Sequence, residues 1–118
     1  MLVAFSVAPS GTGERAPTTG GGRDDSVTAA VADAVRVVRA SGLPHRTDAM
    51  FTTVEGEWHE CMEVVRGAVE AAGRYGSRVS LVLKADIRPG LTGELQGKVD
   101  RLEAAVGEAS TGGTGERL

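Results

Sequence analysis

The chain has 118 residues, which suits about one domain, and its 41% apolar content supports a single modest core. Its 13 basic and 16 acidic residues nearly balance and form no long run of one sign, and no apolar run is long enough to cross a membrane, so nucleic acid and membranes are poor partners. The single cysteine, Cys61, excludes an intramolecular disulfide framework and fits a reducing compartment, so we expect a cytoplasmic protein.

The first third of the chain predicts a strand, a loop and a helix. Residues 2–8 form a short apolar run ended by Pro9, which is typical of a buried strand. The segment at about residues 13–24 has too much Gly, Thr, Pro and charge to pack and predicts a mobile loop. Residues 27–38 carry valine and alanine at helical spacing, and Gly42 predicts a left-handed cap at the end of this helix.

The middle of the chain predicts a hairpin, a second helix and a long strand. Residues 45–55 are rich in β-branched residues and leave no room for a helix, so they predict two short strands. The second helix begins at Glu57 or Trp58. Its predicted apolar stripe consists of Trp58, Cys61, Met62, Val65, Ala68, Val69 and Ala72. Residues 78–87 alternate between core-type and semi-polar side chains and predict the strongest strand.

The order of elements predicts the fold class. A third helix carries an apolar stripe of Leu95, Val99, Leu102 and Val106, and residues 109–118 predict a disordered tail. The order β-α-β-β-α-β with an added helix predicts an α+β, ferredoxin-like sandwich. Residues 1–108 then form one domain, in which two helices cover one face of a four-stranded antiparallel sheet. The alternation leaves open which set of first-strand residues faces the helices.

Five short strings carry a family resemblance. They are SVAPSGTGE at residues 6–14, SGLPHRTDAM at 41–50, TTVEGEWHECMEVV at 52–65, ADIRPG at 85–90 and GKVDRLE at 97–103. In this order and spacing they resemble the thiamine-binding (YkoF-like) family of small ferredoxin-like proteins. The resemblance implies a homodimer or homotetramer in which open sheet faces meet, and a role with thiamine or its hydroxymethylpyrimidine precursor. Residues 15–23 are an insertion relative to the family, and Phe51 and His59 replace its usual Gly and Asp.

The hairpin supplies the leading ligand candidates. Glu55 with Thr52 and Thr53 offers a carboxylate and hydroxyls that suit an aminopyrimidine with a cationic thiazolium. The residues alone favour a cap of the second helix or a solvent position for Glu55, whereas the resemblance favours the ligand. The full predicted ligand-binding set is Ser6, Thr12, Met50, Thr52, Thr53, Glu55, Lys84 and Asp86.

The other members of this set have alternative interpretations. Ser6 and Thr12 lie near a Gly-bearing strand end whose backbone amides could hold a polar ligand edge, although a plain turn is the commoner outcome. Lys84 and Asp86 lie on one side of the long strand, where charge pairing and a site-lining role are equally supported.

The chain shows no catalytic cluster. His59 and Cys61 are two apart on a predicted helix and do not share a face, so we predict no metal site, and Cys61 is typical of a core side chain. With the resemblance, this predicts a non-catalytic binding protein for a thiamine-like ligand, acting as carrier, buffer or sensor without a cofactor of its own. The alternatives are a cofactor-independent enzyme that uses the open sheet face, and an oligomeric interaction module without a small-molecule ligand.

Overall fold

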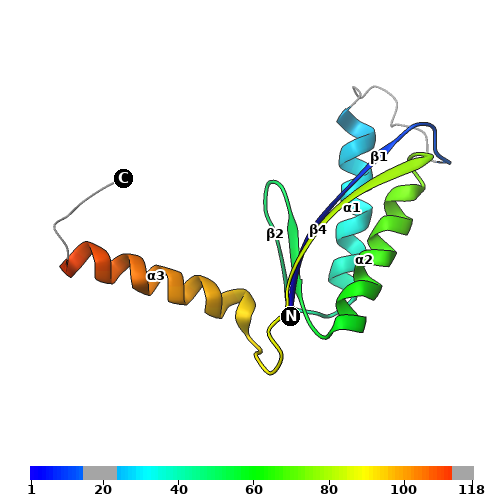
Figure 1. The fold of residues 1–118 in the computed structure, drawn as a ribbon. Helices are drawn as coiled ribbons and strands as arrows, with labels where there is room; N and C mark the ends of the chain where they lie inside the picture. The colour runs from blue at the N-terminus through cyan, green and yellow to red at the C-terminus, as the bar shows by residue number, and fades with distance from the viewer. Residues whose placement is uncertain (15–23, 113–118) are drawn as a thin grey trace.

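The computed structural model describes residues 1–14 and 24–112 (Figure 1). Its elements are β1 (Leu2–Ser10), α1 (Asp24–Ala40), β2 (His45–Thr47), β3 (Thr52–Glu55), α2 (Trp58–Gly73), β4 (Arg78–Asp86) and α3 (Glu94–Gly112). The strands form one antiparallel sheet in the order β2-β3-β1-β4, and α1 and α2 lie side by side on one face of it. The predicted α+β, ferredoxin-like fold is confirmed.

The structure decides which face of β1 enters the core. Val3, Phe5 and Val7 are buried against the helices, because their alternate spacing places all three on the covered face. Ala4 is paired with Thr53 on one side and Lys84 on the other. The opposite, open face of the sheet therefore carries small and charged side chains together with the apolar Val82, which lies opposite Ser6.

The α2 helix begins where the sequence predicts, but its first residue does not join the core. Glu57 is the N-cap, and its backbone N–H donates to Glu60 Oε1 at 2.9 Å in a capping box. Trp58 is 59% exposed, so its predicted place in the apolar stripe is wrong. The buried side of the helix starts at Cys61, because only there does the helix turn a side chain toward the sheet.

The third helix is longer than predicted and projects from the body of the domain (Figure 1). It continues to Gly112, whereas the sequence predicts a domain end at residue 108 and a disordered tail from 109. Of the predicted mobile loop and tail, residues 15–23 and 113–118 lie outside the described residues.

Candidate functional site

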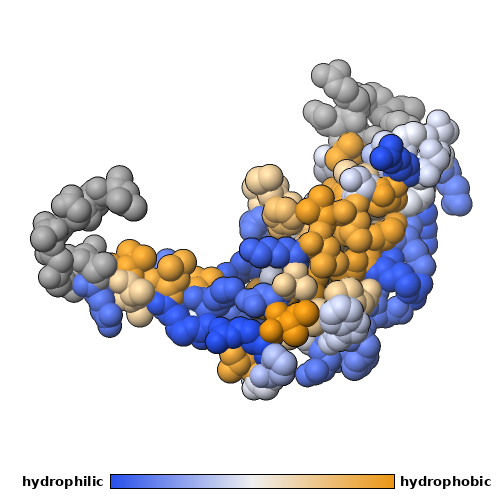
Figure 2. Space-filling model, viewed as in Figure 1, coloured by the Kyte–Doolittle hydropathy of each residue, from blue (hydrophilic) through white to orange (hydrophobic). Residues whose placement is uncertain are grey.

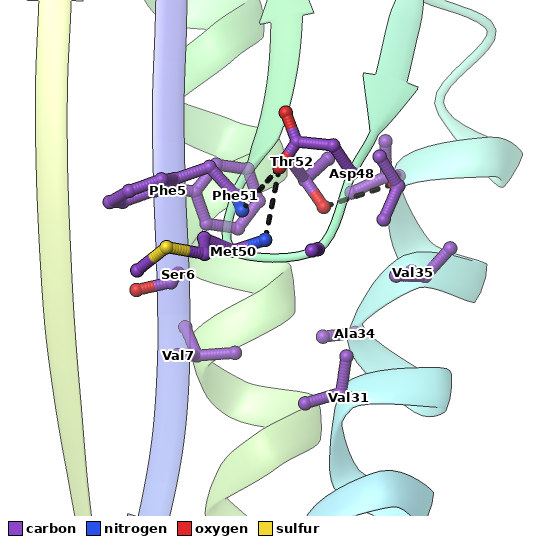
Figure 3. A pocket seen from close by; sticks show the side chains of 13 residues that line it. Phe5, Ser6, Val7, Val31, Ala34, Val35, Asp48, Met50, Phe51 and Thr52 are labelled. Carbon is purple, nitrogen blue, oxygen red and sulfur yellow. Dashed lines mark hydrogen bonds between the residues drawn. The ribbon is translucent and has the colours of Figure 1, made fainter.

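A cavity of about 140 Å³ opens where the strands of the sheet differ in length (Figure 3). The short β3 pairs with β1 only through Leu2–Phe5, whereas β4 pairs with β1 as far as Ser10. One edge of β1 therefore has no strand partner beyond Phe5 among the described residues. The β2–β3 turn and α1 enclose this edge and form the cavity.

The cavity is lined mostly by apolar side chains and by a few polar ones. The walls are formed by Phe5, Val7, Val31, Ala34, Val35, Val38, Ala49, Met50 and Phe51. The polar lining residues are Ser6, Thr47, Asp48 and Thr52. The Oγ1 atoms of Thr47 and Thr52 lie 3.1 Å apart and share a hydrogen bond, and Thr52 is buried. This mixture of an apolar wall and few polar groups is typical of small-molecule sites.

Asp48 is the charged residue at the mouth of the cavity. Its Oδ1 accepts hydrogen bonds from the backbone N–H groups of Met50 and Phe51, each at 3.0 Å (Figure 3). These two bonds lower the pKa of the Asp48 carboxyl below its ordinary value of 3.8. The carboxylate therefore stays ionised at neutral pH, and its orientation is set by the turn. Sequence reasoning missed Asp48, although an aspartate two residues before a turn apex is a known signal of such a side-chain-capped turn.

The predicted ligand-binding residues separate into two groups on opposite sides of the sheet. Met50 and Thr52 line the cavity on the covered side, and Ser6 borders the cavity although its side chain shares the open face with Ala4. The registers place Thr53, Glu55, Lys84 and Asp86 on the open face with Ala4 and Leu2. Thr12 is exposed beyond the end of β1 and does not line the cavity. The structure thus does not unite the eight residues in one site, because alternate residues of a strand point to opposite faces.

Glu55 has a structural partner. Its side chain is buried, and its Oε2 and Oε1 accept hydrogen bonds from the backbone N–H groups of Glu94 at 2.9 Å and Leu95 at 3.2 Å. A carboxylate at this position satisfies free amides and interacts favourably with the positive end of the helix dipole. Glu55 therefore anchors α3, and the interpretation of it as a cap of the second helix is wrong, since Glu60 supplies that bond. The ligand role of Glu55 stays a prediction.

Other open-face residues also hold the first turns of α3. Arg46 Nη2 donates to Gln96 Oε1 at 2.7 Å, and Lys98 Nζ donates to Asp86 Oδ2 at 2.6 Å. The Lys98 ammonium lowers the pKa of the Asp86 carboxyl below its ordinary value of 3.8. Of the two predicted open-face charges, Asp86 thus makes a structural ion pair with α3.

This ion pair predicts a pH-dependent contribution to stability. Because the folded state lowers the pKa of Asp86, the pair stabilises the fold above pH 3.8 and stops doing so as the pH falls through the lower, folded value. We expect Asp86→Asn to lower the free energy of unfolding equally at pH 7 and pH 5, and progressively less below pH 4. Urea unfolding at each pH measures this difference. In a Lys98→Met background, we expect the effect of Asp86→Asn on the free energy of unfolding to lose most of its pH dependence. If Asp86→Asn lowers the free energy of unfolding as much at pH 3 as at pH 7, the assignment is wrong.

Cys61 occupies the core, as predicted. Its side chain is fully buried, and burial raises the pKa of the thiol, which disfavours the nucleophilic thiolate. Within residues 1–14 and 24–112, no three His, Cys, Asp or Glu side chains gather as a metal site would require. None of the helices in these ranges combines the length and apolar character needed to span a membrane.

Comparison with known proteins gives consistent matches over most of the chain. The model of the family described as thiamine-binding protein matches residues 3–103. The UPF0045 protein Mb1933 of Mycobacterium bovis is 49% identical over 104 residues, which cover 87% of this chain and 91% of that protein. A solved domain of unknown function, DUF77, from Bacillus cereus has a TM-score of 0.62 at 28% identity and covers 80% of this chain and 84% of its own.

A second solved structure supports the fold. It is a Thermotoga maritima protein assigned provisionally to thiamine biosynthesis or salvage, with a TM-score of 0.64 at 24% identity. The alignment covers 86% of this chain and 96% of that protein. At this identity the likeness concerns the arrangement of helices and strands.

Proposed function

This chain belongs to the thiamine-binding protein family, and on that premise we propose that it is a non-catalytic binding protein for thiamine or its hydroxymethylpyrimidine precursor. In this proposal it serves in the cytoplasm as a carrier, buffer or sensor. The observation that carries the proposal is the oriented Asp48 carboxylate at the mouth of an apolar cavity.

The cavity suits one ring of such a ligand. Its volume of about 140 Å³ is below the roughly 300–1,000 Å³ of complete ligand pockets. We therefore place the pyrimidine ring against Val31 and Val35, with its amine donating to Asp48 and the cationic thiazolium outside. The edge of β1 from Ser6 onward, which has no strand partner among the described residues, supplies backbone donors and acceptors for the ring nitrogens.

The lining residues favour binding over catalysis. Asp48 is the sole titratable side chain among the described residues that line the cavity. The neighbouring hydroxyls of Ser6, Thr47 and Thr52 have no histidine or lysine beside them in this lining to act as a base. This supports a binding role over the alternative of a cofactor-independent enzyme.

The exposed surfaces support self-association into a homodimer or homotetramer. Val99, Leu102 and Val106 on α3 are 38%, 63% and 56% exposed. The radius of gyration of the Cα atoms is 17.9 Å, against roughly 13.5 Å for a compact domain of this length. We propose that a second copy covers the apolar stripe of α3 and the open face of the sheet, because a monomer leaves both in water.

We expect Asp48→Asn to weaken binding of thiamine and of hydroxymethylpyrimidine by about tenfold or more, since a hydrogen bond to a charged acceptor becomes a bond to a neutral one. The asparagine side chain keeps an oxygen that can accept hydrogen bonds from the backbone N–H groups of Met50 and Phe51, so the turn is retained. Isothermal titration calorimetry with both compounds, and with choline as an unrelated cation, measures the affinities.

Asp100→Asn is the matched control, because it makes the same substitution on the exposed surface of α3 away from the cavity. Equal affinities for wild type and Asp48→Asn would contradict the proposed site. An absence of heat with every pyrimidine would favour the interaction module, and conversion of any compound to a product would favour the enzyme.

A further inference from the structure

The β2–β3 turn presents a carboxylate to the cavity and keeps its own backbone donors occupied. Asp48 Oδ1 accepts hydrogen bonds from the backbone N–H groups of Met50 and Phe51, and the Asp48 N–H donates to the Phe51 carbonyl oxygen at 2.9 Å. A phosphate group at a turn is held by backbone N–H groups that point outward. Three such groups are bonded within this turn, which therefore offers a ligand a negatively charged acceptor.

No basic side chain compensates this charge among the described residues that line the cavity. Arg46, on the neighbouring strand β2, lies opposite Thr53 on the open face and is bonded to α3 there. The hydroxyls of Thr47 and Thr52, which line the cavity, share a hydrogen bond with each other. An anionic group on a bound ligand would therefore meet the Asp48 carboxylate without a cation from this lining beside it.

The sheet surface next to the cavity is apolar as well. Residues 5–7 of β1, which line or border the cavity, pair with an apolar stretch of β4 that consists of Leu83, Val82 and Leu81. All three β4 residues are exposed, and Figure 2 shows apolar side chains gathered over this part of the sheet. Apolar surroundings lower the effective dielectric constant, so repulsion between two negative charges is stronger here than in bulk water.

The arrangement of groups on the ligand brings this repulsion to one position. Under the proposed function, on which this inference rests, the pyrimidine amine donates to Asp48. The amine and the hydroxymethyl group are on adjacent ring carbons, so a phosphate ester of that hydroxyl lies about 5–8 Å from the carboxylate. The phosphate ester of thiamine is on the thiazolium side of the molecule, about 10–12 Å from the same carboxylate, where salt screens most of the repulsion.

We propose that Asp48 makes this site selective for the free hydroxymethylpyrimidine alcohol over its phosphate ester, while thiamine and thiamine phosphate are scarcely distinguished. Charge repulsion at one end of the ring selects the ligand, and the size of the cavity does not. The ligand class is an aminopyrimidine whose substituent next to the amine carries no negative charge. Thiamine fits this class, because its substituent at that position is a cation.

Isothermal titration calorimetry with hydroxymethylpyrimidine, its phosphate ester, thiamine and thiamine phosphate tests the selectivity. In about 0.02 M salt, we expect the wild type to bind the alcohol about tenfold more tightly than its ester, and thiamine at most about threefold more tightly than thiamine phosphate. In about 0.5 M salt we expect the first ratio to fall to about threefold or less, because salt screens the repulsion and leaves the hydrogen bonds in place.

Asp48→Asn separates charge from hydrogen bonding in the same titrations. The alcohol and its ester carry the same amine, so both lose the charged acceptor, and only the ester is relieved of repulsion. We expect the ratio of the two affinities to fall to about twofold. Asp100→Asn, the matched control on α3, keeps the wild-type ratio. The salt series on the wild type gives the same answer if the variant binds too weakly to be measured.

The outcomes distinguish the selectivity from the binding function itself. If the alcohol binds and its ester binds equally well or better, the selectivity is wrong and the binding function stands. A preference for the alcohol that survives both high salt and Asp48→Asn would show a steric origin and overturn the role of Asp48. If none of the four compounds binds, the proposed function is wrong and the selectivity is lost with it.

Discussion

We expect Glu55→Ala to release the first turn of α3 and to lower the free energy of unfolding by about 1.5–3 kcal/mol. The buried carboxylate of Glu55 accepts hydrogen bonds from the backbone N–H groups of Glu94 and Leu95. Among the described residues, these two N–H groups have no other acceptor. Removal of the carboxylate leaves the Glu94 N–H, in a buried residue, without its partner. Urea unfolding measures the loss, and hydrogen exchange of the two amides locates it.

Glu60→Ala is the matched control for this prediction. Glu60 also accepts from a backbone N–H at a helix start, but at the exposed end of α2. It is expected to cost about 0.5–2 kcal/mol and to leave exchange at Glu94 unchanged. Unaltered protection of the Glu94 and Leu95 amides in Glu55→Ala would contradict the anchoring role. A loss of thiamine affinity in Glu55→Gln without a change in these amides would instead restore the ligand role predicted from sequence.

Gly76→Ala is expected to destabilise the fold by about 1–3 kcal/mol through overpacking of backbone against backbone. A Cβ at Gly76 would lie 2.4 Å from the carbonyl oxygen and 2.8 Å from the nitrogen of Ser10. The end of β1 passes so closely over the turn between α2 and β4 that only glycine fits. Because Ser10 is held in the sheet opposite Arg78, the strand end cannot shift without loss of pairing. Thermal or urea unfolding measures the change.

Gly73→Ala, three residues earlier, provides the comparison. A Cβ there would meet only the Val79 side chain at 3.8 Å, an ordinary contact. Since alanine is a better helix former than glycine, we expect this variant to be neutral or more stable by up to about 1 kcal/mol. Equal effects of the two substitutions would show that the close approach at Ser10 does not constrain residue 76.

Local sequence patterns were sufficient for the order and type of the elements. The alternation over residues 78–87 and the apolar spacing in α2 predicted their strand and helix, because these periods follow directly from backbone geometry. Gly42 predicted the left-handed end of α1 and has φ 77°. Trp58 was placed wrongly in the core, since spacing alone does not tell where the covered side of a helix begins.

The candidate site was predicted only in part. Met50 and Thr52 line the cavity with Ser6, but sequence reasoning combined them with residues that face the opposite side of the sheet. Asp48 was missed because its importance depends on the space left where β3 stops short of the end of β1. That space is set by the pairing of segments far apart in the chain.

By itself, the sequence determined the fold class, the family and a polar hairpin as the region of interest, because periodicity, turn residues and short strings are local properties. Only the tertiary structure decided which strand face is covered, that Glu55 holds α3, and that β4 ends the sheet with an apolar edge. These features depend on strand register and on contacts between distant segments, and register is set by the packing of the whole sheet against its helices.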